Sequence, residues 1–263
     1  MAHVLVTNDD GVQAPGLLAL AQALRRLEGV EVSVLAPDRN WSASGHVKTL
    51  HRPLRVWEVE LDDGTRALTT DGAPSDCVAL AMLGLLERKV DLVVSGINAH
   101  ANLGHDVTYS GTVTAAMEAV ISGVPGVAVS LDNPYEPGHR AEYRPAATIA
   151  QRVVAWALEH GLPQGVLLNV NVPLGDLSDF RGIRITRLGL RVYRDRLIKR
   201  VDPAGRPYYW IGGEAPTGIP EDGTDIGALA QGFVSITPLQ LDLTAYHAFE
   251  ALRGLEEEGG SLA

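Results

Sequence analysis

The stretch Val4-Leu5-Val6-Thr7-Asn8-Asp9-Asp10-Gly11 joins a run of β-forming residues to two adjacent carboxylates. An apolar run without alternation predicts a strand that is buried on both faces of a sheet. Pro15-Gly16 then opens a helical pattern, with apolar residues at Leu17, Leu20, Ala21, Leu24 and Leu27. Ligands of open α/β sheets bind where strands end, so Asp9 and Asp10 stand at the place expected for chemistry.

Two ionised neighbours repel one another, and this repulsion is relieved when a cation lies beside them. A divalent metal ion is the simplest candidate for that cation. The alternative is an ordinary turn, because Asn, Asp and Gly all favour turns. Residues 8–11 alone do not distinguish a metal site from an ordinary turn. The loops later in the sequence are needed for that decision.

Composition narrows the class of protein. The 263 residues are 46% hydrophobic and 21% charged, which is typical of one large globular α/β domain or a domain with an appendage. A net charge of -10 argues against a nucleic-acid duplex as partner. No apolar run approaches the roughly 20 residues of a membrane span, and the N-terminus has no signal-peptide pattern, so no membrane association is expected. The single cysteine, Cys77, cannot form an intrachain disulfide and fits a cytoplasmic location.

Strand and helix patterns alternate through the first 130 residues, which predicts parallel strands joined by right-handed crossovers, and a further helix and core strand follow. The predicted strands are Val4–Thr7, Val32–Ala36, Leu92–Ser95, Val127–Ser130 and Leu167–Val170. The predicted helices are Leu17–Leu27, Ser75–Glu87, Gly111–Ser122 and about Arg144–His160. A hairpin of Arg52–Trp57 and Arg66–Thr70 interrupts the series.

The pattern changes from about Phe180 to short β-like pieces, at Ile183–Arg187, Arg196–Val201, Pro207–Ile211 and Gly232–Thr237. The middle two pieces predict a hairpin, and two aromatic-rich strands would be marginal alone. We therefore expect an arm that packs on another subunit, followed by a terminal helix over Thr244–Glu257 with Thr244 as its N-cap. The prediction is one domain over 1–263, with a core over about 1–180 and the arm and helix over about 181–263.

Four polar loops follow predicted strands and should project from one edge of the sheet: residues 8–11, 36–45, 95–104 and 109–112. They offer oxygen ligands and no thiolate, which suits Mg²⁺, Mn²⁺ or Ca²⁺ better than zinc or copper. Ser110-Gly111-Thr112 at a helix start could bind a phosphate, although alone it is more typical of a plain N-cap.

These motifs closely resemble the survival protein E (SurE) family of metal-dependent nucleotidases. The resemblance rests on residues 8–11, 14–16, 36–40, 95–98, 109–112, 169–173 and 234–239, in the family's order. It implies a Rossmann-like core and a phosphomonoesterase that hydrolyses nucleoside 5′- and 3′-monophosphates to nucleoside and phosphate. It also implies a homodimer or homotetramer in which a C-terminal segment is exchanged between subunits.

The same resemblance implies the site. The family's metal ligands fall on Asp9, Asp10, Ser42 and Asn98, with Ser42 preferred to Ser44. Its residues near the phosphate fall on Asn40, Asn102, Ser110, Gly111 and Thr112. We expect one ion per subunit, Mg²⁺ or Mn²⁺, to polarise the phosphate and activate a water. Asp9 or Asp10 could be the general base, a ligand only, or the acceptor in a covalent aspartyl-phosphate.

Two other classes of protein remain as alternatives. A regulatory module could bind a nucleotide without turnover, but simple binding would not require two carboxylates and a metal-compatible Asn98. A nicotinamide oxidoreductase would have a Gly-x-Gly-x-x-Gly fingerprint where this chain has Asn-Asp-Asp-Gly. The spacings of His46, His100 and His105 match no strong zinc motif, so we expect solvated or hydrogen-bonded loop histidines.

Overall fold

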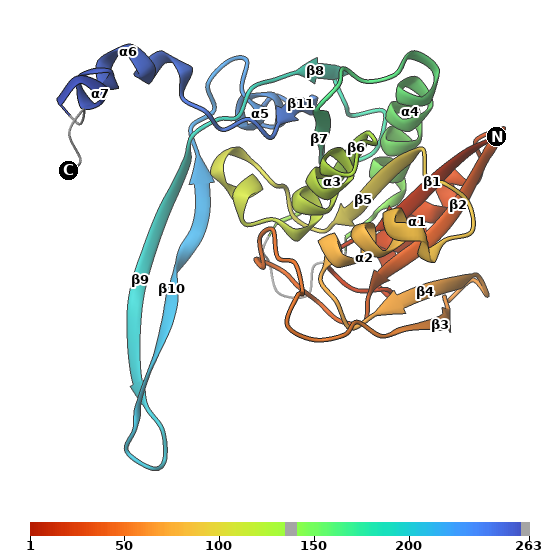
Figure 1. The fold of residues 1–263 in the computed structure, drawn as a ribbon, viewed down its shortest axis with the longest axis horizontal. Helices are drawn as coiled ribbons and strands as arrows, with labels where there is room; N and C mark the ends of the chain where they lie inside the picture. Colours follow the sequence, from red (N-terminus) through yellow and green to blue (C-terminus); the bar gives the residue numbers. More distant parts are fainter. Residues whose placement is uncertain (135–140, 259–263) are drawn as a thin grey trace.

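The computed structural model describes residues 1–134 and 141–258. Their main element is a sheet whose nine strands run in the order β3-β4-β2-β1-β5-β6-β7-β11-β8 (Figure 1). The strands are β1 (Ala2–Thr7), β2 (Val30–Pro37), β3 (Val56–Glu60), β4 (Arg66–Thr70), β5 (Leu92–Asn98), β6 (Gly126–Asp132), β7 (Val166–Pro173), β8 (Ile183–Ile185) and β11 (Val234–Gln240). The run from β4 to β7 is parallel, whereas β3 pairs antiparallel with β4 and β11 pairs antiparallel with β7. The edge strand β8 pairs parallel with β11. The predicted mostly parallel sheet is confirmed.

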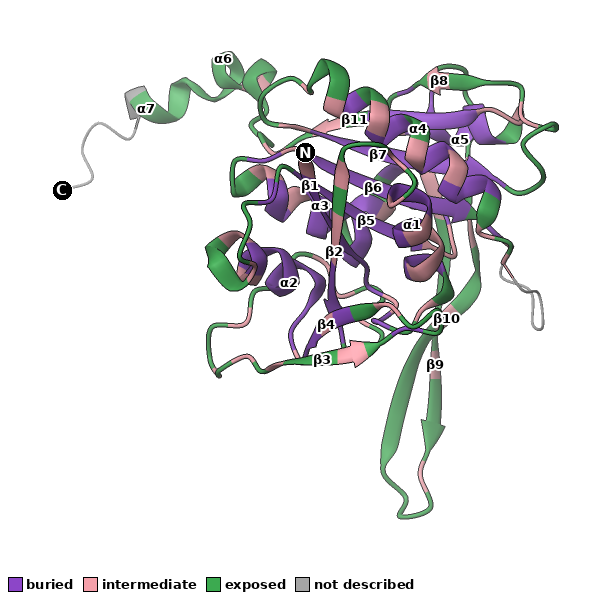
Figure 2. Ribbon diagram, turned by 90° about the vertical axis from the view of Figure 1, so that its right-hand side faces the viewer, coloured by how far each residue is buried: buried purple, intermediate pink, exposed green. Residues whose placement is uncertain are grey.

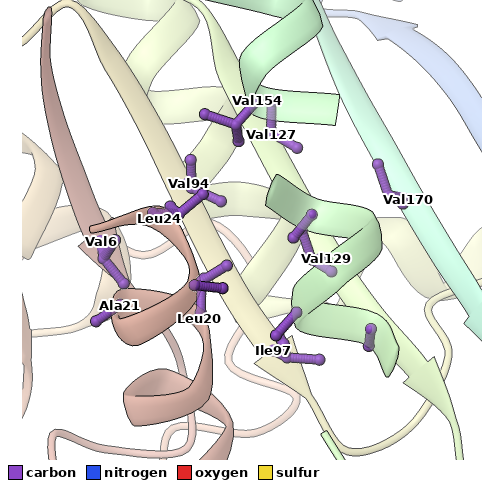
Figure 3. Close-up of a cluster of buried hydrophobic side chains, with 14 of the residues drawn as sticks. Val6, Leu20, Ala21, Leu24, Val94, Ile97, Val127, Val129, Val154 and Val170 are labelled. Atoms are coloured by element: carbon purple, nitrogen blue, oxygen red, sulfur yellow. The ribbon is translucent and has the colours of Figure 1, made fainter. Parts of the chain in front are cut away.

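Helices cover both faces of this sheet. The helices α1 (Pro15–Leu24) and α4 (Arg144–His160) pack together on one face, and α2 (Pro74–Leu80) and α3 (Gly111–Ile121) on the other. Alternate residues of β1 enter the two cores: Val6 packs with the α1 and α4 side chains (Figure 3), and Leu5 packs with those of α2 and α3. Because both faces are covered, the first strand is apolar without alternation, as predicted.

The order of the strands decides where the loops meet. The chain passes from β1 to β2 on one side and later returns to β5 on the other side of β1. Thr7 at the end of β1 lies in register beside Ser95 of β5. This is the topological switch point of the sheet, where crevices for ligands form. The loops that carry the two aspartates and Asn98 therefore emerge side by side.

A long hairpin leaves the body of the molecule. Its strands β9 (Arg191–Val201) and β10 (Pro207–Gly218) form an antiparallel pair that projects away from the sheet (Figure 1) and is exposed along most of its length (Figure 2). Apolar side chains are exposed on it, including Leu197, Trp210 and Ile211. The predicted hairpin is confirmed, and both strands are longer than the sequence indicated.

The prediction of one continuous terminal helix is wrong. The segment is divided into a 3-10 turn, Tyr246–Ala248, and the short helices α6 (Phe249–Leu252) and α7 (Gly254–Glu258). Thr244 does not act as N-cap, since Ala245 stands at that position and no side chain caps the turn. No side chain of Tyr246–Leu252 is buried. A helix this short gains little stability without packing, so local propensity alone does not hold one continuous rod.

Further differences from prediction include two boundaries and one short helix. The helix expected over 75–87 ends at Leu80 and continues as a wider π turn to Leu85, where Gly84 adopts φ +104°. The strand β3 begins at Val56 because the preceding N–H of Arg55 donates to Asp71 instead (3.0 Å). Helix α5 (Asp225–Ala230), capped by Thr224, was not predicted, because six residues carry too little periodicity.

No helix in the described ranges has the length and hydropathy needed to span a membrane.

Candidate active site

Asp9 and Asp10 stand where β1 ends and the chain turns. Asn8 makes the turn: its amide nitrogen donates to the Gly11 carbonyl (2.9 Å) and its amide oxygen accepts from the Gly11 N–H (3.2 Å). Gly11 has φ +104°, which favours glycine. The turn interpretation thus accounts for Asn8 and Gly11, and it leaves both carboxylates for another role.

Asp9 is buried against the start of α3. The Thr112 hydroxyl donates to Asp9 Oδ1 (2.6 Å). A Cβ on Gly111 would lie 2.7 Å from the Asp9 Cβ, so the helix approaches this closely only because residue 111 is glycine. Burial raises the pKa of Asp9, and hydrogen bonds from the Thr112 side chain and from the N–H groups of Thr112 and Gly111 act in the opposite direction. The start of α3 therefore offsets part of the cost of burying the Asp9 charge, and the pKa of Asp9 stays above its ordinary value.

Asp10 is more open and less well compensated. Its Oδ1 accepts a hydrogen bond from the Asn40 amide (3.2 Å). Burial, and then the negative charge of Asp9, raise the pKa of Asp10 to about 6. Among the described residues, neither carboxylate forms an ion pair with a lysine, arginine or histidine. A divalent cation between them would relieve both the burial and the mutual repulsion.

Asn98 and Ser42 supply oxygen atoms of the kind that a hard cation prefers. The Asn98 amide nitrogen donates to the His100 carbonyl (2.6 Å), so the amide oxygen is what Asn98 can offer to a ligand. Ser42 lines the same cavity as the aspartates, whereas Ser44 is not one of its lining residues. Within the described ranges, no group of three or more His, Cys, Asp or Glu side chains could hold a metal ion. A metal here would need the amide and hydroxyl oxygens together with both carboxylates, and the donor set fits Mg²⁺ or Mn²⁺.

The predicted site residues gather at one cavity of about 280 Å³. Six of the nine line it: Asp9, Asp10, Ser42, Asn98, Asn102 and Ser110. Asn40 lines an adjoining cavity of about 430 Å³ that shares Asp10, and Gly111 and Thr112 lie against Asp9. A larger groove of about 570 Å³ lies between α4 and the outer strands, but its lining is apolar apart from Arg152. That groove has no group suited to phosphoryl chemistry.

Asn102 is fixed from behind by strand β7. Its N–H donates to Asn171 Oδ1 (2.8 Å), and its carbonyl accepts from the amides of Asn169 (2.9 Å) and Asn171 (3.1 Å). Its own amide nitrogen donates to Ser130 Oγ (2.8 Å). All of these groups are buried. The Asn-Val-Asn motif of β7 therefore holds the loop that follows β5.

The loop assigned to phosphate has more than one role. Ser110 is the N-cap of α3, since its hydroxyl accepts from the Val113 N–H (3.1 Å), and it also lines the cavity. Thr112 and Gly111 direct their polar groups to Asp9, as described above. Of the three residues, Ser110 is the one that lines the cavity.

The sequence did not indicate that the base of the hairpin arm closes one side of the cavity. Arg191 from β9 and Pro216 from β10 line it, with Asp106 and Tyr109 from the loops. Arg191 lies beyond the predicted core boundary at about residue 180, in a segment whose pattern indicated only an arm. No local signal in the sequence marks a contact between residues that lie so far apart in the chain.

His46 and His100 are hydrogen-bonded and His105 is solvated, as expected. His46 contacts the buried Glu118 carboxylate (2.9 Å), and His100 Nδ1 contacts the Asn133 carbonyl (2.9 Å). His105 is exposed and does not line the cavity. This arrangement gives no support to a zinc site.

Comparisons with known proteins all indicate the same family. The family model described as Survival protein SurE matches residues 4–195. A curated relative from Herpetosiphon aurantiacus, named 5′-nucleotidase SurE, is 57% identical over 242 residues, 92% of this chain and 93% of the relative. A relative of the same name from Chloroflexus aggregans is 54% identical over 256 residues, 97% of this chain and 100% of the relative. The crystal structure of the SurE protein from Aquifex aeolicus is similar with a TM-score of 0.80 at 41% identity, covering 97% of this chain and 99% of that one.

Proposed function

We propose that this chain, which belongs to the survival protein SurE family, is a metal-dependent phosphomonoesterase that hydrolyses nucleoside 5′- and 3′-monophosphates. The observation that carries the proposal is the pair of adjacent carboxylates at the switch point of the sheet, Asp9 buried and Asp10 half-buried, without a basic partner among the described residues. Relatives of high identity over nearly the whole chain are named 5′-nucleotidase, which supports this substrate class.

One divalent ion per subunit, Mg²⁺ or Mn²⁺, would be held by Asp9, Asp10, Ser42 and Asn98. When bound, such an ion supplies Lewis-acid stabilisation of the phosphate charge and lowers the pKa of the attacking water. The chain's own part is to position these oxygen atoms. Asp9 is suited to a fixed ligand, because α3 holds its carboxylate in place.

Asp10 is the better placed general base. Its carboxylate is half-buried and accepts one hydrogen bond, from Asn40, whereas Thr112 and the start of α3 hold Asp9. Asn40, Asn102 and Ser110 would donate hydrogen bonds to the phosphate oxygens, with Gly111 and Thr112 behind them. Phosphoryl transfer depends mainly on such positioning and charge stabilisation.

The test of this function is phosphate release from a panel of nucleoside monophosphates. We expect chelation to lower the rate by about 100-fold or more, and Mg²⁺ or Mn²⁺ to restore it, because the carboxylates alone repel the substrate. Circular dichroism before and after chelation is the control for folding. If folded protein releases no phosphate with either ion, the enzyme is excluded, and a nucleotide-binding module becomes the better interpretation.

We also propose a single domain over 1–263 that assembles as a homodimer or homotetramer in the cytoplasm. The arm supports the assembly, because its exposed apolar side chains have no cover within the described part of the chain. The single, buried cysteine supports the location.

The double change Trp210→Ser and Ile211→Ser tests the arm. These side chains are 64% and 84% exposed, so the fold of the subunit should survive while contacts between subunits are lost. We expect light scattering to give the mass of one 28.0 kDa chain in place of an oligomer. Leu83→Ser, which removes an equally exposed apolar side chain (85%) far from the arm in sequence, in the turn Ala81–Leu85, is the control. An unchanged oligomer in the double variant would contradict the role of the arm.

A further inference from the structure

Arg191 is the one lysine or arginine among the residues that line the 280 Å³ cavity. It is the first residue of β9, so a basic side chain of the arm faces the place where the aspartates gather. Its side chain is only 10% exposed. A buried guanidinium of this kind needs partners, and those partners indicate its role.

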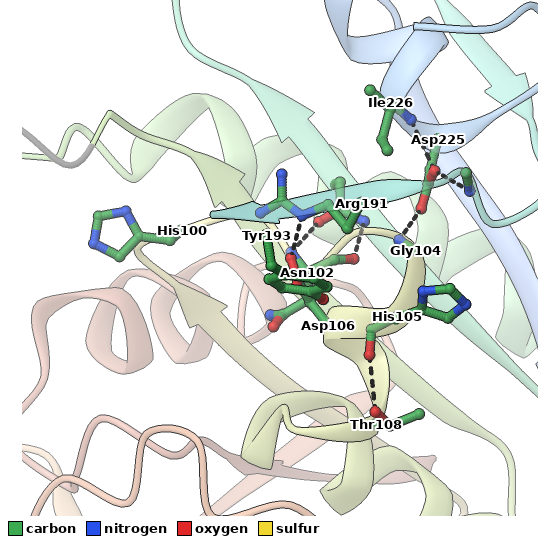
Figure 4. Close-up of polar contacts among 12 residues, drawn as sticks. His100, Asn102, Gly104, His105, Asp106, Thr108, Arg191, Tyr193, Asp225 and Ile226 are labelled. Carbon is green, nitrogen blue, oxygen red and sulfur yellow. Dashed lines mark hydrogen bonds and ion pairs between the residues drawn. The ribbon is translucent and has the colours of Figure 1, made fainter. Parts of the chain in front are cut away.

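Asp106 holds Arg191 in place, and Tyr193 in turn holds Asp106 (Figure 4). Its Nε donates to Asp106 Oδ2 (2.6 Å), and the Tyr193 hydroxyl donates to Asp106 Oδ1 (2.7 Å). Tyr193 follows Arg191 by two residues on the same strand, so both side chains reach the one carboxylate. Asp106 belongs to the turn Gly104–Thr108 that follows the active-site loop.

Asp225 joins the two backbone segments that carry Asp106 and Arg191. The buried Asp225 carboxylate accepts the N–H of Gly104 (2.8 Å) and of Gly189 (2.7 Å), as Figure 4 shows for Gly104. A Cβ on Gly104 would lie 2.4 Å from the Gly189 carbonyl oxygen and 3.2 Å from the Arg191 Cγ. The loop after β5 and the chain that enters β9 are thus held in close contact, which fixes the position of Arg191.

The pairing leaves most of the guanidinium unused. An arginine that serves only an ion pair often binds both carboxylate oxygens with two parallel N–H groups. Here the second oxygen of Asp106 accepts from Tyr193, and only Nε of Arg191 is engaged. Within the described residues, the two terminal nitrogens form no hydrogen bond. They remain as donors at a cavity whose other charged lining groups are carboxylates.

We propose that Arg191 binds the phosphoryl oxygens of the substrate, and that Asp106 and Tyr193 are positioning residues that orient its guanidinium. This inference rests on the function proposed above. Planar guanidinium groups match the geometry of phosphate oxygens, and their charge would offset the repulsion between a phosphate and the aspartates. The arm is then part of the active site of its own subunit.

The test measures binding of inorganic phosphate to the Mn²⁺-loaded protein by calorimetry, together with phosphate inhibition of nucleotide hydrolysis. For Arg191→Met we expect phosphate affinity to fall by about tenfold or more, as for loss of a charge-assisted hydrogen bond. Mn²⁺ affinity, measured alone, should stay within about twofold. Arg187→Gln removes a surface arginine four positions earlier and is the matched control.

Tyr193→Phe separates positioning from folding. It should weaken phosphate binding by about threefold in the natural chain and have no further effect in Arg191→Met, because Tyr193 acts through Arg191. Unchanged phosphate affinity in folded Arg191→Met would overturn the inference. Calorimetry does not require turnover, so loss of phosphate binding and absence of hydrolysis are distinguishable results.

Discussion

Asp10→Asn is expected to lower nucleotide hydrolysis by about 10³-fold and, at the same time, to make the metal-free protein more stable at about pH 7.5. The loss of activity follows if Asp10 is both a metal ligand and the base for the attacking water. Asparagine keeps an oxygen that can accept the hydrogen bond from Asn40, so the local geometry should survive. Most substitutions destabilise, and a gain in stability with a loss of activity marks a carboxylate that serves the reaction.

The sign of the stability change follows from the pKa. Burial and the charge of Asp9 raise the pKa of Asp10 from 3.8 to about 6, so the folded state holds its proton more tightly than the unfolded state. Folding stability therefore falls as pH rises from about 4 to 6, and the whole cost is present above pH 6. One pKa unit corresponds to about 1.4 kcal/mol, so the substitution should raise the free energy of unfolding by roughly 2–3 kcal/mol.

Urea denaturation of the metal-free proteins at about pH 4 and pH 7.5 measures this effect. The two proteins should differ little at the lower pH and most at the higher one. Asp62→Asn, at an exposed position in the turn between β3 and β4, is the control and should change neither stability nor activity. A destabilised Asp10→Asn protein at pH 7.5 would show that the natural carboxylate is already compensated in the folded state.

The acidic pair could be placed from the sequence because the signals that place it are local. An apolar run that ends at Thr7 and a turn made by Asn8 and Gly11 put the two carboxylates at a strand end. The alternation of strands and helices then brings Asn98 to the same edge. These expectations needed no knowledge of side-chain contacts, and the structure brings the predicted residues together.

The role of Arg191 could not be predicted in this way. Its partner Asp106 lies 85 residues away in the sequence, and the contact depends on how the base of the arm packs on a loop. In the terminal segment the sequence predicted too much structure. Helical periodicity was present over 244–257, but the side chains of Tyr246–Leu252 are not buried. Periodicity reports which residues could share a face, and only the folded chain decides whether that face is covered.

The second large effect is expected from Asn171→Leu. Leucine resembles asparagine in size, but it removes the acceptor for the Asn102 N–H and one of the donors to the Asn102 carbonyl. Both groups are buried, and an unpaired buried polar group costs about 1–3 kcal/mol. We expect the free energy of unfolding to fall by about 2–3 kcal/mol. Because Asn102 lines the cavity, its displacement should also lower kcat/KM by about 10²-fold.

Val172→Ala on the same strand separates the two effects. Val172 is equally buried but packs in the apolar core, so its truncation should cost about 2 kcal/mol of stability while the loop after β5 keeps its hydrogen bonds. If the two variants are equally destabilised but Asn171→Leu is much less active than Val172→Ala, then Asn171 positions Asn102 for the reaction. If both variants lose activity in proportion to stability, the Asn-Val-Asn motif serves folding alone, and the loop must take its position from its other contacts.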